Sequence, residues 1–289
     1  MISDQSKNYF SFFNSMRYEY FKFFYGKRFD KFFNLIKYGV IPRPNYALGI
    51  LMAAHQAKEL NYKRISLIEL GCWNFEGLID MENYINDIKK FIDIDFNVYG
   101  FELGTGHIKE EIDPRNRLYE LSGGDYTFKK KDNLKKLKFS KLVLGDVKDT
   151  VPKFLEEGHL DEAPLGFIVF DLGFYTSAKN ALELLRSQSK RYLPRSIIYS
   201  DNNYFVLKNE ADKAAFAEFN KEGNKIISPI GELAEQLSVS WNKWIFLGKR
   251  MYMLSDLKHE KYNVNDEQKI NKLVNSNFSV KKKKKKNFS

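Results

Sequence analysis

With 289 residues, 43% of them hydrophobic, the chain can bury a substantial core, which excludes a largely disordered protein and suggests one large domain or one domain with additions. The single cysteine, Cys72, excludes an internal disulfide framework, and because no apolar run is long enough for a signal stretch or a membrane span, we expect a cytoplasmic protein. Lys281–Lys286 carry six of the ten net positive charges, so the rest of the chain carries about +4 (10 − 6), and no motif resembles a nucleic-acid-binding module.

Residues 1–60 are predicted to form an N-terminal helical extension that is rich in aromatic and basic side chains. Apolar residues recur at helical spacing from Phe13 to Phe24, Gly26 interrupts the pattern, and it resumes over residues 32–36. We interpret this pattern as two short amphipathic helices that cover the core, followed by a helix over residues 46–60. The alternatives for the aromatic segment are an interfacial membrane helix and a contact between two copies of the chain.

Residues 61–263 alternate between strand and helix patterns and are predicted to form the main domain. Short apolar runs predict buried strands at residues 65–70, 96–102, 141–145, 165–171 and 195–200. Helical patterns lie at residues 77–91, 151–157, 177–186, where Ser177 is the expected N-cap, and 210–220. An antiparallel strand pair is expected over residues 241–247 and 250–254. This alternation predicts an α/β fold with a doubly wound, Rossmann-like parallel sheet.

Two segments do not fit this alternation. Residues 107–140 are polar and rich in lysine, and we expect them to form a lid or an insertion loop. Residues 264–289, which include the lysine run, are predicted to be a disordered tail, with electrostatic contact to an anionic membrane surface as the alternative.

Acidic residues or glycines follow the expected strands at the points where these strands end. They are Glu69, Gly71, Glu102, Asp146, Asp171 and Asp201. Right-handed crossovers place the carboxyl ends of parallel strands at one edge of the sheet. Because ligands of such sheets bind in the crevice outside that edge, the pattern predicts a binding site there.

The first two strand ends suggest a nucleotide-like ligand. Gly71 lets the backbone approach a ligand closely, and its spacing to Gly77 differs from a dinucleotide-binding fingerprint, which argues against NAD. Glu102 is placed to accept hydrogen bonds from ribose hydroxyls, with a surface carboxylate as the alternative. Asp146 lies where an adenine amino group could be met, and helix capping is its alternative.

Asp171 follows the most apolar expected strand, and we expect it to face a ligand. Asp201 and Asn202 end the next strand, so the three side chains could converge on a sugar hydroxyl or a divalent metal; oxygen ligands of this kind suit Mg²⁺. The four histidines show no metal-ligand spacing. His107, after the second strand, is either a general base or an exposed loop residue.

Four motifs at these strand ends resemble those of class I S-adenosylmethionine (SAM) methyltransferases. They are Glu69-Leu-Gly71, Gly-Phe-Glu102-Leu-Gly, Leu-Gly-Asp146-Val and Phe-Asp171-Leu-Gly-Phe-Tyr175-Thr-Ser. The resemblance covers residues 43–263 and looks closest to a group of bacterial methyltransferase-like proteins. These proteins are similar to the macrocin-type sugar O-methyltransferases.

The resemblance implies SAM as the cofactor and O-methylation of a sugar or a related hydroxylated small molecule. The cofactor-binding residues that it implies are Glu69, Gly71, Cys72, Gly77, Glu102, Asp146 and Asp171. Asp171 and Tyr175 are the implied catalytic residues. The candidate ligands for Mg²⁺ are Asp171, Asp201 and Asn202.

Two departures from the family pattern favour an alternative function, a non-catalytic binding or assembly protein that keeps the fold without binding SAM. Residues 73–75, Trp-Asn-Phe, stand where the family loop has small residues, and their side chains could fill the methionine pocket. Gly173 and Asn202 stand where the sugar methyltransferases tend to have a second acid. A third and weaker hypothesis is a nucleotide- or sugar-modifying enzyme that uses a different cofactor.

Overall fold

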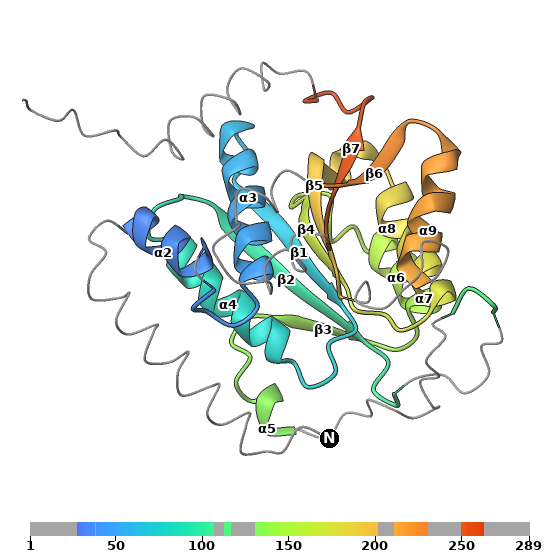
Figure 1. Ribbon diagram of the computed structural model, residues 1–289, viewed down its shortest axis with the longest axis horizontal. Coiled ribbons are helices and arrows are strands. Elements are labelled where there is room, and N and C mark those ends of the chain that lie inside the picture. Colours follow the sequence, from blue (N-terminus) through green and yellow to red (C-terminus); the bar gives the residue numbers. More distant parts are fainter. Residues whose placement is uncertain are drawn as a thin grey trace, which may run out of the picture.

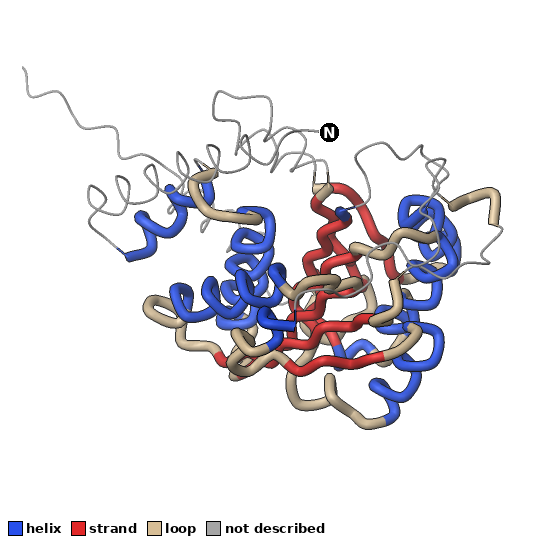
Figure 2. The backbone as a smooth tube through the Cα atoms, turned by 90° about the horizontal axis from the view of Figure 1, so that it is seen from below, coloured by secondary structure: helices blue, strands red, loops and turns tan. Residues whose placement is uncertain are grey.

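A seven-stranded sheet runs through the middle of the protein, between two layers of helices (Figure 1, Figure 2). The computed structural model describes residues 28–37, 39–106, 113–116, 131–201, 211–230 and 250–262. Within these ranges, no helix has both the length and the apolar character that crossing a bilayer requires.

In chain order, the first five strands of the sheet are parallel to one another, and the seventh is antiparallel to both of its neighbours. The strands are β1 (Arg64–Leu70), β2 (Asp95–Glu102), β3 (Lys141–Leu144), β4 (Leu165–Phe170), β5 (Tyr192–Ser200), β6 (Lys225–Pro229) and β7 (Met251–Asp256). Their order across the sheet is β3-β2-β1-β4-β5-β7-β6. β7 pairs antiparallel with both β5 and β6, so the complete sheet is mixed.

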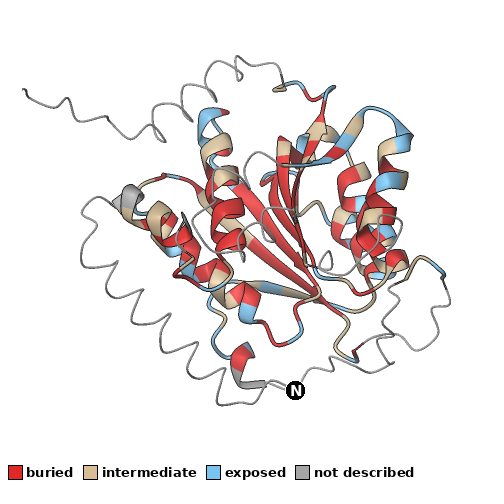
Figure 3. Ribbon diagram, viewed as in Figure 1, coloured by how far each residue is buried: buried red, intermediate tan, exposed pale blue. Residues whose placement is uncertain are grey.

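Helices cover both faces of this sheet. One layer consists of α2 (Arg28–Lys37), α3 (Pro44–Glu59) and α4 (Glu76–Ile88), and the other of α6 (Val147–Glu156), α7 (Tyr175–Ala181), α8 (Glu183–Arg186) and α9 (Ala211–Phe219). The single turn α5 (Lys131–Leu134) precedes β3. Successive strand residues face opposite layers, so Leu67 packs with α3 and α4 while Ile68 packs with the second layer. Figure 3 shows that the central strands are buried along their length.

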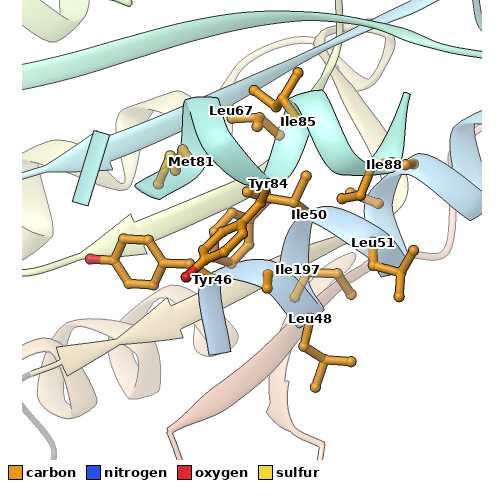
Figure 4. Packing of buried hydrophobic residues seen from close by; sticks show 14 of the residues in the cluster. Tyr46, Leu48, Ile50, Leu51, Leu67, Met81, Tyr84, Ile85, Ile88 and Ile197 are labelled. Carbon is orange, nitrogen blue, oxygen red and sulfur yellow. The ribbon is translucent and has the colours of Figure 1, made fainter. Parts of the chain in front are cut away.

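Helix α3 lies directly on the sheet because Gly49 has no side chain. A Cβ atom at Gly49 would lie 2.3 Å from the ring of Phe167 in β4. Figure 4 shows Ile50 of α3 beside Ile85 of α4 over the sheet, and both belong to the same buried cluster. Thus α3, within the predicted N-terminal extension, packs into the core of the main sheet.

The second of the two expected N-terminal helices is α2. Its residues Phe32, Leu35 and Ile36 are buried, and the ring centroid of Phe32 lies 6.1 Å from that of Tyr84 in α4. The apolar face of α2 therefore covers the core. Residues 1–27, which include the first expected helix, lie outside the described residues.

The predicted α/β, doubly wound fold is confirmed, and all five predicted strands are present. Helix α6 begins at Val147, earlier than predicted, because Asp146 caps it: the Asp146 carboxylate accepts the N–H of Lys148 at 2.8 Å. The predicted capping role of Ser177 is wrong, since α7 begins at Tyr175 and Ser177 lies inside it.

Near the end of the chain, the structure contains one strand, β6, that the sequence did not predict. β6 was not expected because its pattern is weak: of its five residues only Ile227 is buried. β7 confirms the strand expected over residues 250–254, with slightly different ends. Its expected partner over residues 241–247 lies outside the described residues, as does most of the predicted lid over residues 107–140.

Candidate active site

β1 and β4 lie side by side in the sheet. The helices that follow these two strands lie on opposite faces of the sheet. The chain passes from β1 into α4 in one helical layer, and from β4 into α7 and α8 in the other. Ligands of open α/β sheets bind outside the strand ends at such a switch point. The candidate site therefore lies at the ends of β1, β2 and β4 (Figure 1).

The turn after β1 is held against the end of β4. Gly71 has a φ angle of +84°, and a Cβ atom there would lie 2.3 Å from the carbonyl oxygen of Asp171. Only glycine meets both requirements without strain. The backbone N–H of Asp171 also donates to the carbonyl oxygen of Leu70 at 2.9 Å. The two strand ends are thus fixed side by side.

The bulky residues of this turn lie partly in the core and partly in solvent. Phe75 is 1% exposed and packs in the core between the sheet and α4, whereas Trp73 is 44% exposed. Both residues have left-handed backbone conformations, with φ of 63° and 40°. Such a conformation costs about 1–2 kcal/mol for a residue with a side chain. Phe75 is therefore part of the buried cluster, and the prediction that residues 73–75 fill a methionine pocket stays a prediction.

Glu102, at the end of β2, holds this turn through its carboxylate. Its Oε2 atom accepts the backbone N–H groups of Cys72 at 2.9 Å and Trp73 at 2.7 Å. Its Oε1 atom accepts the N–H of Gly104 at 2.8 Å. A carboxylate offers about four acceptor positions, so one position remains on Oε1. The structure therefore places Glu102 beside the glycine turn, with most of its hydrogen-bonding capacity already used.

The Cys72 side chain is enclosed by the turn and by β2. Its Sγ atom lies 3.4 Å from the carbonyl oxygen of Glu69 and 3.5 Å from that of Phe101. Burial, reinforced by the nearby Glu69 carboxylate, raises the pKa of the thiol well above its usual value. The thiol therefore stays protonated, and the backbone N–H is the polar group that Cys72 contributes to the turn.

Glu69, near the end of β1, is buried under the start of α4. The hydroxyl of Tyr46 in α3 donates to its Oε1 atom at 2.8 Å, and its Oε2 atom has no hydrogen-bond partner among the described residues. A Cβ atom at Gly77 would lie 1.9 Å from Oε1, so Gly77 leaves the space that this carboxylate fills. Burial raises the pKa of Glu69 to about 7, although the hydrogen bond from Tyr46 opposes the shift.

Asp171 and Tyr175, the two predicted catalytic residues, lie in different surroundings. Asp171 is exposed at the end of β4, close enough to raise the pKa of the Tyr46 hydroxyl, for which burial is the main cause. Tyr175 is buried at the start of α7, where its hydroxyl bonds to Glu218 of α9 and accepts from Arg115 Nη1 at 2.8 Å. The Arg115 guanidinium carbon also lies 3.7 Å from the centre of the Tyr175 ring. Tyr175 thus joins residues 113–116 to α7 and α9.

The remaining predicted residues have defined partners where they are described. Asp146 caps α6. Asp201, after β5, accepts hydrogen bonds on Oδ1 from the hydroxyl of Tyr199 at 2.6 Å and from Arg250 Nη1 at 2.9 Å. Asn202 and His107 lie outside the described residues.

The described residues do not fit a Mg²⁺ site. Among them, no three His, Cys, Asp or Glu residues are grouped in a way that could hold a metal ion. Gly173 offers no side chain, and Asp201 is already paired with a guanidinium. A magnesium ion usually needs one or two carboxylates with room for several waters.

Several residues of this edge were not predicted because they come from distant segments. Tyr46 and Arg43 belong to the start of α3, and Arg43 Nη1 binds Asp80 of α4 at 2.6 Å. Asn133 of α5 donates to the carbonyl oxygen of Asn74 at 2.9 Å and so braces the turn after β1. The sequence signal available here was that the family resemblance begins at residue 43, which does not indicate these contacts.

Comparison with solved structures finds methyltransferases of low sequence identity. The chain is similar to the O-methyltransferase NovP (16% identity, TM-score 0.44, 62% of this chain and 72% of that chain). It is also similar to the calicheamicin methyltransferase CalS11 (16%, 0.47, 78% and 86%) and to TomG, an O-methyltransferase of tomaymycin synthesis from Streptomyces achromogenes (12%, 0.37, 74% and 79%). No protein-family model matches the chain, and no curated protein matches its sequence.

These similarities concern the fold alone. The described part of the chain itself shows a mixed seven-stranded sheet with helices on both sides.

Proposed function

We propose that the protein is a SAM-dependent methyltransferase that acts on a hydroxyl group of a sugar or a related small molecule. The observation that carries the proposal is the convergence of Gly71, Glu102 and Asp171 at the switch point between β1 and β4. A strand-end acid beside a glycine turn is the arrangement by which nucleotide-binding sheets hold a ribose.

Two acids at this edge could each bind a different part of SAM. The remaining acceptor position on Glu102 Oε1 can take one ribose hydroxyl without displacing a backbone N–H group. Glu69 Oε2 has no hydrogen-bond partner among the described residues, and an ammonium group of the ligand would satisfy it. Cys72 and Gly77 shape the turn around these two acids.

Asp171 is the proposed general base. When bound, SAM supplies an electrophilic methyl group. A neutral alcohol is a poor nucleophile, so a carboxylate that accepts its proton accelerates the transfer. The backbone contacts between the turn after β1 and Asp171 fix the end of β4 from which this carboxylate projects, and such positioning would contribute to the rate. Tyr175 would act indirectly, by holding the start of α7.

Calorimetric titration with SAM and with its product, S-adenosylhomocysteine, tests the proposal. We expect micromolar binding to the full chain and at least about tenfold weaker binding to Glu102→Gln, because the amide would face backbone donors and lose the charge. The matched control is Asp93→Asn, an exposed acid before the start of β2, which should bind normally. Absence of binding to a folded sample would refute the proposal.

A non-catalytic relative of the methyltransferases is the second candidate. One observation favours it: the Glu102 carboxylate already accepts three hydrogen bonds from backbone N–H groups of the protein. A protein that had lost its cofactor would retain such contacts because they brace the turn. The titration separates the candidates, since this alternative predicts a stable, folded chain that binds neither compound.

A further inference from the structure

The carboxylate that follows β5 is already paired with a cation from the neighbouring strand. Arg250 immediately precedes β7, and its Nη1 atom donates to Oδ1 of Asp201 at 2.9 Å. The hydroxyl of Tyr199 donates to the same oxygen at 2.6 Å, and Arg250 Nη1 lies 3.3 Å from that hydroxyl. Oδ1 of Asp201 therefore has two donors, one of them charged.

This pair is anchored in the protein rather than lying free on its surface. The Arg250 side chain is 11% exposed, and its backbone carbonyl accepts the N–H of Ser200 at 3.0 Å. The buried ring of Tyr199 packs edge-on against Tyr46, with 5.6 Å between centroids, and Tyr46 in turn binds Glu69. A continuous set of contacts thus joins Arg250 to the acids at the candidate site.

Among the described residues, the ends of β4 and β5 offer few groups that could bind a metal ion. Its described strand-end acids on β4 and β5 are Asp171 and Asp201, and the second acidic position after β4 is Gly173. A divalent cation next to Asp201 would compete with the Arg250 guanidinium for the same carboxylate. Like charges at such separations repel each other, and the guanidinium is covalently tethered at the site.

We propose that Arg250 supplies the positive charge that a divalent cation would otherwise supply at this edge, so that the site functions without a metal. Asp201 is then a positioning partner of Arg250 and not a metal ligand. The consequence for chemistry rests on the proposed function. If SAM binds here, it would supply the methyl group and leave as S-adenosylhomocysteine, and the Asp171 carboxylate would accept the proton of the attacking hydroxyl without the help of a metal ion.

Titration of the full chain with Mn²⁺, followed by the paramagnetic resonance signal of the free ion, tests the assignment directly. We expect no stoichiometric binding with a dissociation constant below about 1 mM in the wild type. Arg250→Met removes the charge and keeps an apolar stem, and it should bind Mn²⁺ at least about tenfold more tightly than the wild type. Arg250→Lys keeps the charge and should behave like the wild type.

Two results would overturn the proposal. Stoichiometric Mn²⁺ binding to the wild type that Asp201→Asn abolishes would make Asp201 a metal ligand. A folded Arg250→Met chain that gains no affinity would show that Arg250 does not occupy a cation position. If Arg250→Met does not fold, Arg250→Gln removes the same charge, and the same gain in Mn²⁺ affinity is expected of it.

The outcome is separable from that of the proposed function. The Mn²⁺ titration contains no SAM, so it reports on Arg250 even if the protein binds no cofactor. If SAM does bind, its affinity in the presence of a chelator should equal that with added Mg²⁺. A chelator-induced loss of SAM affinity in the wild type would contradict metal independence.

Discussion

Glu69 is the acid of the site whose ionised form is most disfavoured by burial. Both of its oxygens are buried, and Oε2 has no hydrogen-bond partner among the described residues. Burial is the main cause that raises its pKa from 4.5 to about 7. Because the pKa is raised on folding, the protonated acid stabilises the fold, and this contribution is lost as the pH rises from 4.5 through 7.

Replacing Glu69 by glutamine should therefore remove a pH-dependent loss of stability. We expect Glu69→Gln to match the wild type near pH 5 and to exceed its free energy of unfolding at pH 8 by up to about 3 kcal/mol. Urea denaturation at a series of pH values measures the difference. The exposed acid Glu162 provides the control Glu162→Gln, whose stability should track that of the wild type. A glutamine variant less stable than the wild type at pH 8 would contradict the assignment.

For single residues, the sequence predicted where the acids of the site lie better than it predicted which groups they bind. Glu102 and Asp171 were expected at the carboxyl edge because each follows an apolar strand pattern, and both lie there. Two of the three N–H groups that Glu102 accepts, those of Cys72 and Trp73, belong to the turn with left-handed residues Trp73 and Phe75, which no periodicity encodes. Arg250 lies about fifty positions from Asp201, so its role emerges only from the pairing of β5 with β7.

At the scale of elements, α4 holds the segment that leads into β3. The Glu82 carboxylate of α4 accepts the backbone N–H groups of Lys138, Phe139 and Ser140 at 2.8–3.1 Å, together with the Ser140 hydroxyl at 2.7 Å. Burial opposes ionisation, but these hydrogen bonds outweigh it and lower the pKa of Glu82. One carboxylate thus anchors the segment that leads into the edge strand β3.

Glu82→Gln should loosen this junction. The amide replaces an acceptor with a donor that faces backbone N–H groups, and we expect a loss of about 1–3 kcal/mol in the free energy of unfolding at pH 7. Chemical denaturation gives the value. Glu156→Gln, an exposed residue of the same type on α6, is the matched control and should change stability little. Equal effects of the two changes would mean that Glu82 does not hold the segment.

Element boundaries were predictable where hydrophobic burial alone decides them. The five parallel strands have apolar runs that match their buried positions. The start of α6 was misjudged because Asp146 caps it, so that the helix begins four positions before its expected start. β6 was missed because four of its five residues are at least partly exposed. Local hydrogen bonding and edge position, which carry little periodic signal, account for these differences.

At the scale of the whole molecule, the strand order creates the candidate site. Connections on opposite faces after β1 and β4 open the edge where Gly71 and Asp171 meet, and β2 brings Glu102 to the same place. The alternation of strands and helices was enough to predict this edge. It was not enough to predict that α3 lies over it with Tyr46, or that β7 closes it with Arg250.

Hydrogen–deuterium exchange of the full chain, with and without saturating S-adenosylhomocysteine, tests whether the cofactor binds at this edge of the sheet. We expect slower exchange with the ligand in residues 71–78, 101–104 and 171–175, and unchanged exchange at the opposite edge, in residues 89–95. No protection in these three segments, or protection confined to other parts of the chain, would contradict a cofactor site at the switch point between β1 and β4.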